Sequence, residues 1–163
     1  MLNKKVETAL NDHMAKEMAS SYLYLSMAAY FLGENLNGFA HWMKIQAKEE
    51  WTHAMKFFDY IHARGGRAKL ESMAKPKANF ESALKVVEET CEHEKKISAW
   101  IHQLYELAGH EKDFATQAML QWFLNEQVEE EASVSHILEK LKIIPEKSSA
   151  ILYLDKELGK REG

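Results

Sequence analysis

The sequence contains few of the residues that interrupt helices or build covalent frameworks. Its 163 residues include seven glycines, two prolines and one cysteine. The single cysteine, Cys91, excludes an internal disulfide framework and any cysteine-rich zinc or iron–sulfur site. The longest uncharged run, residues 18–33, is 16 residues long and contains three serines. It is therefore too short and too polar to cross a bilayer.

An excess of positive charge is also missing. Lysine and arginine number 21 against 25 aspartates and glutamates, which gives a formal net charge of −4. This balance argues against a dedicated binder of nucleic acid or of anionic membranes. Residues 1–7 have no apolar core of the kind that a secretion signal needs. We therefore expect a soluble cytoplasmic protein with one domain, residues 1–163, and with neither nucleic acid nor membrane as a partner.

Glycine and proline leave four long stretches of the chain uninterrupted. These stretches are rich in alanine, leucine, methionine, glutamate, lysine and glutamine, which are strong helix formers. They predict an all-α protein with helices over residues 5–32, 38–64, 80–108 and 112–142, the third capped by Asn79. A short fifth helix is expected after Pro145, over residues 146–158.

The two links between the early helices differ in length, and this difference predicts the topology. Residues 33–38 form a short link, which makes the first two helices antiparallel neighbours. Residues 65–79 form a link of fifteen residues, long enough at about 3.3 Å per residue to run the length of a helix. We expect a four-helix bundle over residues 5–142 with one long crossover between helices 2 and 3. A loose surface loop is the alternative that length alone leaves open.

Each helix has a predicted buried seam that is apolar at both ends and polar near its middle. The polar residues of the four seams include Glu17; Gln46, Glu50 and His53; Glu94; and Gln127 and Glu130. An isolated carboxylate in an apolar core costs several kcal/mol unless it is paired or binds a metal. No lysine or arginine lies on these central positions. A bound cation is the simplest counter-charge, and the alternative is that the glutamates lie at the seam edges and reach water.

The spacing of these residues gives a second indication of a shared site. The pairs Glu17 and Glu94, Glu50 and Gln127, and His53 and Glu130 are each 77 residues apart. This constant offset predicts two helix pairs related by a pseudo-twofold axis, with a site built across them. In addition, a Glu-x-x-His pair, here Glu50 and His53, puts two ligands on one helix face. Carboxylates with one imidazole and no thiolate suit iron or manganese, and a carboxylate such as Glu50 can bridge two ions.

These motifs make the chain similar to the bacterial non-haem ferritins over essentially its whole length. The matching segments are Glu17, residues 48–53 (Lys-Glu-Glu-Trp-Thr-His), Glu94 and residues 125–131 (Asn-Glu-Gln-Val-Glu-Glu-Glu). The resemblance implies two irons in each subunit. The ligands would be Glu17, Glu50 and His53 at the first iron, and Glu50, Glu94 and Glu130 at the second, with Gln127 beside them as a neutral participant.

The same resemblance implies further residues near the iron pair. Glu49, Glu126 and Glu129 match a third iron site, with Glu130 shared. For these three the alternative is an acidic surface in contact with water. Tyr24 matches a tyrosine next to the irons, and its alternative is a hydrogen-bonded core residue.

The resemblance further implies a ferritin-like fold and a hollow homo-oligomer of 24 subunits. Such a shell would oxidise Fe²⁺ with O₂ or H₂O₂ and store ferric mineral inside. Haem is not expected, because position 52 is threonine where haem-binding relatives have methionine, and position 130 is glutamate rather than histidine. Two other functions stay open on sequence alone: a di-iron oxygenase or peroxidase with another substrate, and a metal-free helical scaffold.

Overall fold

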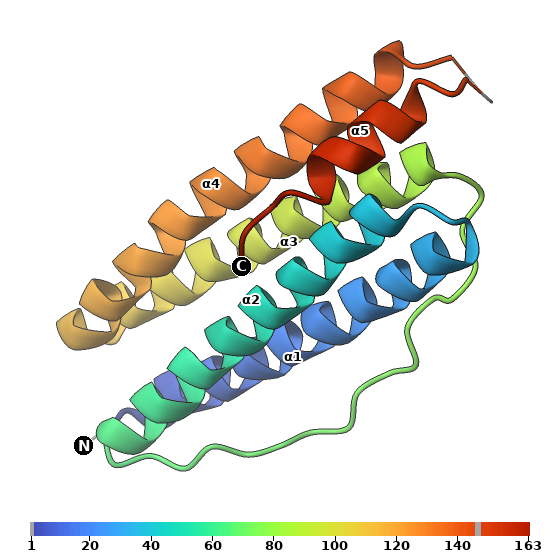
Figure 1. Ribbon diagram of the computed structural model, residues 1–163. Helices are drawn as coiled ribbons and strands as arrows, with labels where there is room; N and C mark the ends of the chain where they lie inside the picture. The colour runs from blue at the N-terminus through green and yellow to red at the C-terminus, as the bar shows by residue number, and fades with distance from the viewer. Residues whose placement is uncertain (1, 146–147) are drawn as a thin grey trace.

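The computed structural model describes residues 2–145 and 148–163, within which all regular secondary structure is helical. The helices are α1 (Lys4–Gly33), α2 (Asn37–Ala63), α3 (Ala83–His110), α4 (Phe114–Ile143) and the short α5 (Ile151–Leu158). The four long helices lie side by side along a common direction, with α1 packed mainly on α2 and α3 mainly on α4 (Figure 1). The predicted four-helix bundle with a short C-terminal helix is confirmed.

The segment between α2 and α3 runs along the outside of the bundle. It leads from the C-terminal end of α2 to the opposite end of the bundle, where α3 begins (Figure 1). Side chains of α1 hold it there. The Asn11 side chain donates to the Arg67 carbonyl over 3.1 Å and accepts from the Lys69 N–H over 2.6 Å. Ser26 donates to the Lys77 carbonyl over 2.7 Å. The crossover is therefore fixed to α1, which excludes the loose-loop alternative.

The third helix starts later than the sequence indicated. It begins at Ala83 rather than at residue 80, and Ser82 caps it by accepting from the Lys85 N–H over 3.2 Å. The predicted cap, Asn79, is wrong. Phe80 instead leaves the helix path and packs edge-on against the ring of Tyr30, 5.3 Å between centroids. Packing of this partly buried ring on Tyr30 explains why the helix does not begin at residue 80.

The fifth helix is also shorter than predicted, beginning at Ile151 rather than at residue 146. Residues 146 and 147 of the predicted span lie outside the described residues. Residues 149–150 form a turn, in which Ser148 Oγ accepts from the Ala150 N–H over 3.2 Å. Such local bonding by serine competes with helix formation and delays the helix start.

Helix α5 docks against the start of α2. The Asp155 carboxylate accepts from the N–H groups of Gly38 and Phe39 over 2.8 and 2.9 Å, and so caps α2 from another helix. Leu154 and Leu158 are buried beneath α5. A Cβ atom on Gly38 would lie 1.6 Å from the Asp155 carbonyl oxygen, so the docked α5 requires glycine there.

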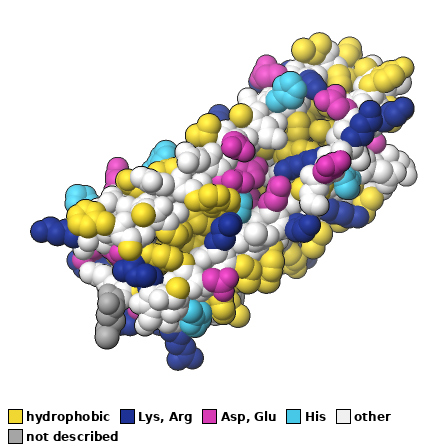
Figure 2. Space-filling model, turned by 60° about the vertical axis from the view of Figure 1, so that its left-hand side comes forward, with side chains coloured by type: hydrophobic (Ala, Val, Ile, Leu, Met, Phe, Trp, Pro, Cys, Tyr) yellow, Lys and Arg dark blue, Asp and Glu magenta, His cyan; other side chains and the backbone are white. Residues whose placement is uncertain are grey.

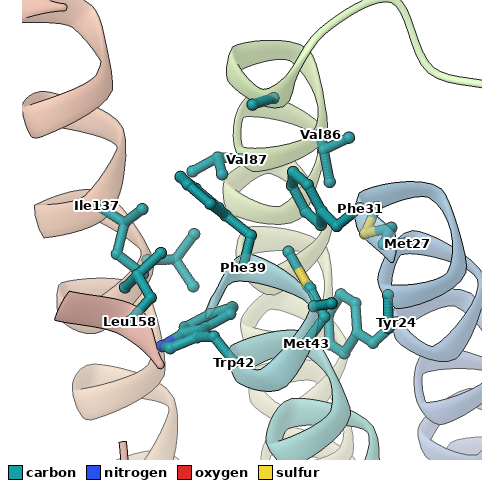
Figure 3. Packing of buried hydrophobic residues seen from close by; sticks show 14 of the residues in the cluster. Tyr24, Met27, Phe31, Phe39, Trp42, Met43, Val86, Val87, Ile137 and Leu158 are labelled. Atoms are coloured by element: carbon teal, nitrogen blue, oxygen red, sulfur yellow. The ribbon is translucent and has the colours of Figure 1, made fainter. Parts of the chain in front are cut away.

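Two apolar clusters fill the bundle. One includes Tyr24, Phe31, Phe39, Val87 and Ile137, and Figure 3 shows Trp42 of α2 beside Ile137 of α4 and Leu158 of α5. The other contains, among others, Leu10, Met14, Phe57, Ile101 and Phe123. Along each long helix, one cluster takes residues from one end and the other cluster takes residues from the other end. Between them lie the central polar residues Glu17, Glu50, His53, Glu94, Gln127 and Glu130. None of the described helices is both long enough and apolar enough to cross a membrane.

Candidate metal centre

Each long helix contributes a buried carboxyl group between the two apolar clusters. We call the set the carboxylate centre: Glu17 from α1, Glu50 and His53 from α2, Glu94 from α3, and Gln127 and Glu130 from α4. These side chains are at most 5% exposed. One face of the molecule also has acidic side chains gathered near its middle (Figure 2). This burial excludes the alternative in which the four glutamates lie at the seam edges and reach water.

The first group of potential ligands consists of Glu17, Glu50 and His53. One ligand atom from each residue lies within 4.8 Å of the other two. Glu50 and His53 are one turn apart on α2, and Nδ1 of His53 is 3.6 Å from Glu50 Oε2. Glu17 Oε2 and both carboxylate oxygens of Glu50 are buried and find no hydrogen-bond partner within residues 2–145 and 148–163. Buried oxygens of this kind are costly unless a cation binds them.

A second group consists of His53, Glu126 and Glu130, again with one atom from each within 4.8 Å of the others. Nε2 of His53 lies 3.9 Å from Glu126 Oε1. The two nitrogens of the imidazole therefore face different carboxylates. His53 is thus the residue that the two groups share.

Glu94 differs from Glu17 and Glu50 because both of its carboxylate oxygens already accept hydrogen bonds. The Tyr24 hydroxyl donates to its Oε1. Gln127 Nε2 lies 3.1 Å from Glu94 Oε2 and 3.3 Å from the Glu94 carbonyl oxygen. Among the described residues Glu94 belongs to neither ligand group. Glu94, Tyr24 and Gln127 therefore form a hydrogen-bonded unit next to the two groups.

Burial and mutual repulsion shift the carboxyl pKa values upward. Burial, together with the charges of Glu94 and Glu130, raises the pKa of Glu17 to about 7. Burial and the charge of Glu94 raise the pKa of Glu130 to about 7. The pKa of Glu50 is raised well above its ordinary value by burial and by the charge of Glu17. At neutral pH the metal-free centre therefore holds protons, which a bound cation would displace.

The neighbouring His53 and Tyr24 are shifted by the same surroundings. Burial opposes protonation of His53, but its contact with Glu50 and the charge of Glu130 outweigh burial and raise the imidazole pKa. Burial and the charge of Glu94 raise the pKa of the Tyr24 phenol. Tyr24 therefore stays protonated and acts as a donor to Glu94.

The structure does not gather the three further acidic residues, Glu49, Glu126 and Glu129, which we call the outer acids. Glu126 joins His53 in the second group. The Glu49 carboxylate instead accepts from Nη2 of Arg161 over 2.6 Å. Glu129 is exposed, one position before Glu130.

Sequence reasoning missed two residues near the centre, His13 and Arg161, and did not identify the partner of a third, Gln46. His13 Nε2 lies 2.8 Å from Glu17 Oε1, and burial lowers the pKa of this imidazole to about 3, so it is neutral. The i, i+4 spacing on α1 was a usable signal for this pair. Gln46, which the seam contained, donates to Glu130 Oε2 over 2.8 Å. Arg161 binds Gln46 and Glu49 from the end of the chain, and no local pattern indicated it.

Comparison with known proteins agrees with this architecture. The family profile of the ferritin-like domain matches residues 7–144. The chain belongs to the ferritin family. The bacterial non-heme ferritin of Bacteroides fragilis strain 638R is 42% identical over 161 residues, covering 99% of this chain and 100% of that protein. That of Staphylococcus aureus strain MRSA252 is 39% identical over 161 residues, covering 99% and 97%.

Solved structures of ferritins superimpose closely on the chain. The open-pore ferritin of the archaeon Archaeoglobus fulgidus has a TM-score of 0.97 at 48% identity, covering 99% of this chain and 98% of that one. A humanized archaeal ferritin has a TM-score of 0.98 at 48% identity and covers both chains fully. The predicted resemblance to bacterial non-haem ferritins is confirmed. Membership of this family supports iron storage with ferroxidase activity as the function.

Proposed function

We propose that the protein stores iron by oxidising Fe²⁺ to Fe³⁺ at the carboxylate centre and retaining the ferric product inside a hollow shell. The observation that carries this proposal is the set of buried, unpartnered oxygens on Glu17 and Glu50. Four buried glutamates with one histidine and no thiolate provide the hard donor set that iron prefers. Iron is the substrate here, and the protein supplies its binding geometry.

Two ferrous ions would bind at the centre of each subunit. The ligands we assign are Glu17, Glu50 and His53 for the first, and Glu50, Glu94 and Glu130 for the second, with Gln127 as a neutral neighbour. The unpartnered oxygens on Glu50 support its role as the shared carboxylate. Glu94 would have to exchange a hydrogen bond from Tyr24 or Gln127 for a metal contact.

The raised carboxyl pKa values suit a site that binds and releases ions repeatedly. Protons stabilise the empty centre, and ferrous ions displace them as they bind. Two Fe²⁺ would each give one electron, so that together they reduce one O₂ to H₂O₂, or one H₂O₂ to two water molecules, with two protons taken up from solvent. We assign Tyr24 to the catalytic surroundings, since it is a buried phenol that donates directly to the ligand Glu94.

A third, weaker iron site is assigned to the outer acids Glu49, Glu126 and Glu129, with Glu130 shared. The short approach of Glu126 to His53 and Glu130 supports part of this site. The ion pair between Glu49 and Arg161 opposes it in the metal-free protein.

We further propose a homo-oligomer of 24 subunits, located in the cytoplasm, without haem. The close superposition on ferritins supports the shell. Thr52 and Glu130 occupy positions at which haem-binding relatives differ, and this supports a haem-free protein.

The deciding experiment combines size-exclusion chromatography with iron loading. A large shell that retains thousands of ferric ions is the expected result, and a small oligomer that oxidises Fe²⁺ without retaining iron would contradict it. Anaerobic Fe²⁺ titration should give two tight ions per chain and a weaker third. The Glu129→Gln variant should alter later oxidation and iron turnover more than the first fast phase. Loss of the first phase in this variant would overturn the division between a central pair and an outer site.

A further inference from the structure

The chain beyond α5 returns to the middle of the bundle, where its end lies near α2 (Figure 1). Arg161 makes the main contacts of this tail. Its Nη1 donates to Gln46 Oε1 over 2.5 Å, and its Nη2 donates to Glu49 Oε2 over 2.6 Å. Its guanidinium also lies over the ring of Trp42, 4.8 Å from the centroid. One planar group thus makes three contacts with a single helix.

The fold itself fixes where this guanidinium lies. Arg161 is three residues beyond the buried Leu158 of α5, and Asp155 anchors that helix to the start of α2. In addition, His41 Nε2 lies 2.8 Å from the Arg161 carbonyl oxygen. The tail is therefore held by its side chain and by its backbone, both on α2.

Gln46 connects the tail to the carboxylate centre. Its side chain is fully buried, and its Nε2 donates to Glu130 Oε2 over 2.8 Å. A guanidinium has only donors, so Arg161 requires the amide oxygen of Gln46 to face it. The amide nitrogen must then face Glu130. Arg161 therefore sets the direction of the hydrogen bond that Glu130 receives.

We propose that Arg161 is a positioning residue for the carboxylate centre. Through Gln46 it orients Glu130 for metal binding, and through its ion pair it keeps Glu49 unavailable to a cation. This inference rests on the proposed function, because it concerns the affinities of the central and outer metal sites. It assigns two opposite effects to one side chain: a favourable one at the centre and an unfavourable one at the outer acids.

The test uses Co²⁺ as a redox-stable dication and follows its visible absorption and its binding heat. Three variants of the full-length protein separate the two effects. Arg161→Met keeps an unbranched, flexible apolar stem but removes every donor. Gln46→Leu removes the link to Glu130 and leaves the pair between Arg161 and Glu49. Lys160→Gln removes a neighbouring charge of the tail and serves as the matched control.

In Arg161→Met, central Co²⁺ binding should weaken about tenfold, the usual scale for removing an outer-shell partner of a metal ligand. Binding at the outer acids should strengthen about threefold, because a competing surface ion pair is lost. Gln46→Leu should reproduce the first change without the second. Lys160→Gln should match wild type in both affinities and in its absorption bands.

Two results would overturn the proposal. One is an Arg161→Met protein whose central and outer affinities equal those of wild type. The other is a parallel weakening of both sites, which would indicate general loosening of the fold. If wild-type protein bound no Co²⁺ tightly at the centre, the proposed function would fail first. A normal wild-type titration with an unchanged variant would count only against Arg161.

Discussion

The two helix pairs present the carboxylate centre in different states. On the α1–α2 side, Glu17 Oε2 and both oxygens of Glu50 have no partner within the described part of the chain. On the α3–α4 side, Glu94 accepts from Tyr24 and Gln127, and Glu130 accepts from Gln46. We call the α1–α2 side of the centre the open half and the α3–α4 side the braced half. The two halves differ although their ligand positions are related by the same offset of 77 residues.

The difference in hydrogen bonding shows that the two halves of a pseudo-symmetric bundle can have different roles in metal binding. Unpartnered carboxylates bind a cation strongly, because binding relieves both their burial and their repulsion. Braced carboxylates are held in one orientation, which limits the movement needed when a second ion arrives. We therefore expect substitutions of ligand residues in the open half to change metal affinity and the pH dependence of stability more than substitutions in the braced half.

The largest effect is expected when the open half loses Glu50. Glu50→Ala should slow fast ferrous oxidation by at least about 100-fold and abolish most of the metal-induced rise in melting temperature. The metal-free protein should keep its stability, because removal of an unpartnered buried carboxyl group, with its desolvation cost and its repulsion of the other carboxylates, offsets the small cavity. Stopped-flow mixing of Fe²⁺ with oxidant measures the first effect, and calorimetry with and without anaerobic Fe²⁺ measures the second.

Asp59→Ala is the matched control for this substitution, since Asp59 is an exposed carboxylate on the same helix. It should behave as wild type in both assays. Rapid oxidation by Glu50→Ala, or a loss of several kcal/mol in its metal-free form, would make Glu50 a structural residue.

The next effect concerns the pH dependence of the metal-free protein. Glu17 has a pKa of about 7 in the native state, raised first by burial, against 4.5 as its ordinary value. Between these values the native state binds more protons than the unfolded state, so the free energy of unfolding falls as pH rises. In the Glu17→Gln variant the side chain at position 17 has no titratable group. The stability of this variant relative to wild type should therefore increase from about pH 4.5 to about pH 7, by on the order of 3 kcal/mol, and then level off.

Denaturation in the presence of a chelator, at several pH values, measures this gain. His93, whose pKa burial lowers to about 4, acts in the opposite direction, but it is present in both proteins and cancels in the difference. Glu94→Gln is the comparison from the braced half and should gain less, because Glu94 already accepts two hydrogen bonds. Equal gains in both variants would show that the halves are electrostatically equivalent.

A smaller effect is expected from the one brace in the open half, His13. His13→Leu removes the donor to Glu17 Oε1 and should weaken the first ferrous ion about tenfold. His13→Gln still carries a donor and should recover most of that affinity. Anaerobic Fe²⁺ titration of the three proteins decides the matter. Equal affinity in the leucine variant and in wild type would reduce His13 to a packing partner of Phe57.

Local patterns in the sequence indicated candidate ligands in both halves of the centre. Glu50 and His53 are one turn apart on α2, so helical spacing alone indicated that they meet. Glu17 follows the seam of α1, and its meeting with them followed from the predicted bundle. The four-helix topology followed from the lengths of the two links. These features depend on neighbouring residues and on chain length, which a sequence displays directly.

The missed contact of Arg161 and the misplaced start of α3 depend on tertiary structure, whereas the His13–Glu17 pair is local to α1. Arg161 meets Gln46 across 115 positions of the sequence, and this meeting requires α5 to dock first. The start of α3 was misplaced because Phe80 finds a ring partner, Tyr30, from a distant helix. Long-range packing decided both outcomes, and helix propensity carries no information about it.

The smallest effect tests whether the braced half depends on that docking. Asp155→Ala removes the acceptor for the Gly38 and Phe39 N–H groups and should lower the free energy of unfolding by about 1 kcal/mol. Because Arg161 follows α5 in the chain, looser docking should also weaken the hold on Glu130. Calorimetry and Co²⁺ titration should therefore show a modest loss confined to the second ion, while the first ion binds as in wild type. Asp155→Asn keeps an acceptor oxygen and should lose less in both measurements. Equal loss at both ions in the alanine variant would mean that α5 supports the bundle as a whole rather than its braced half.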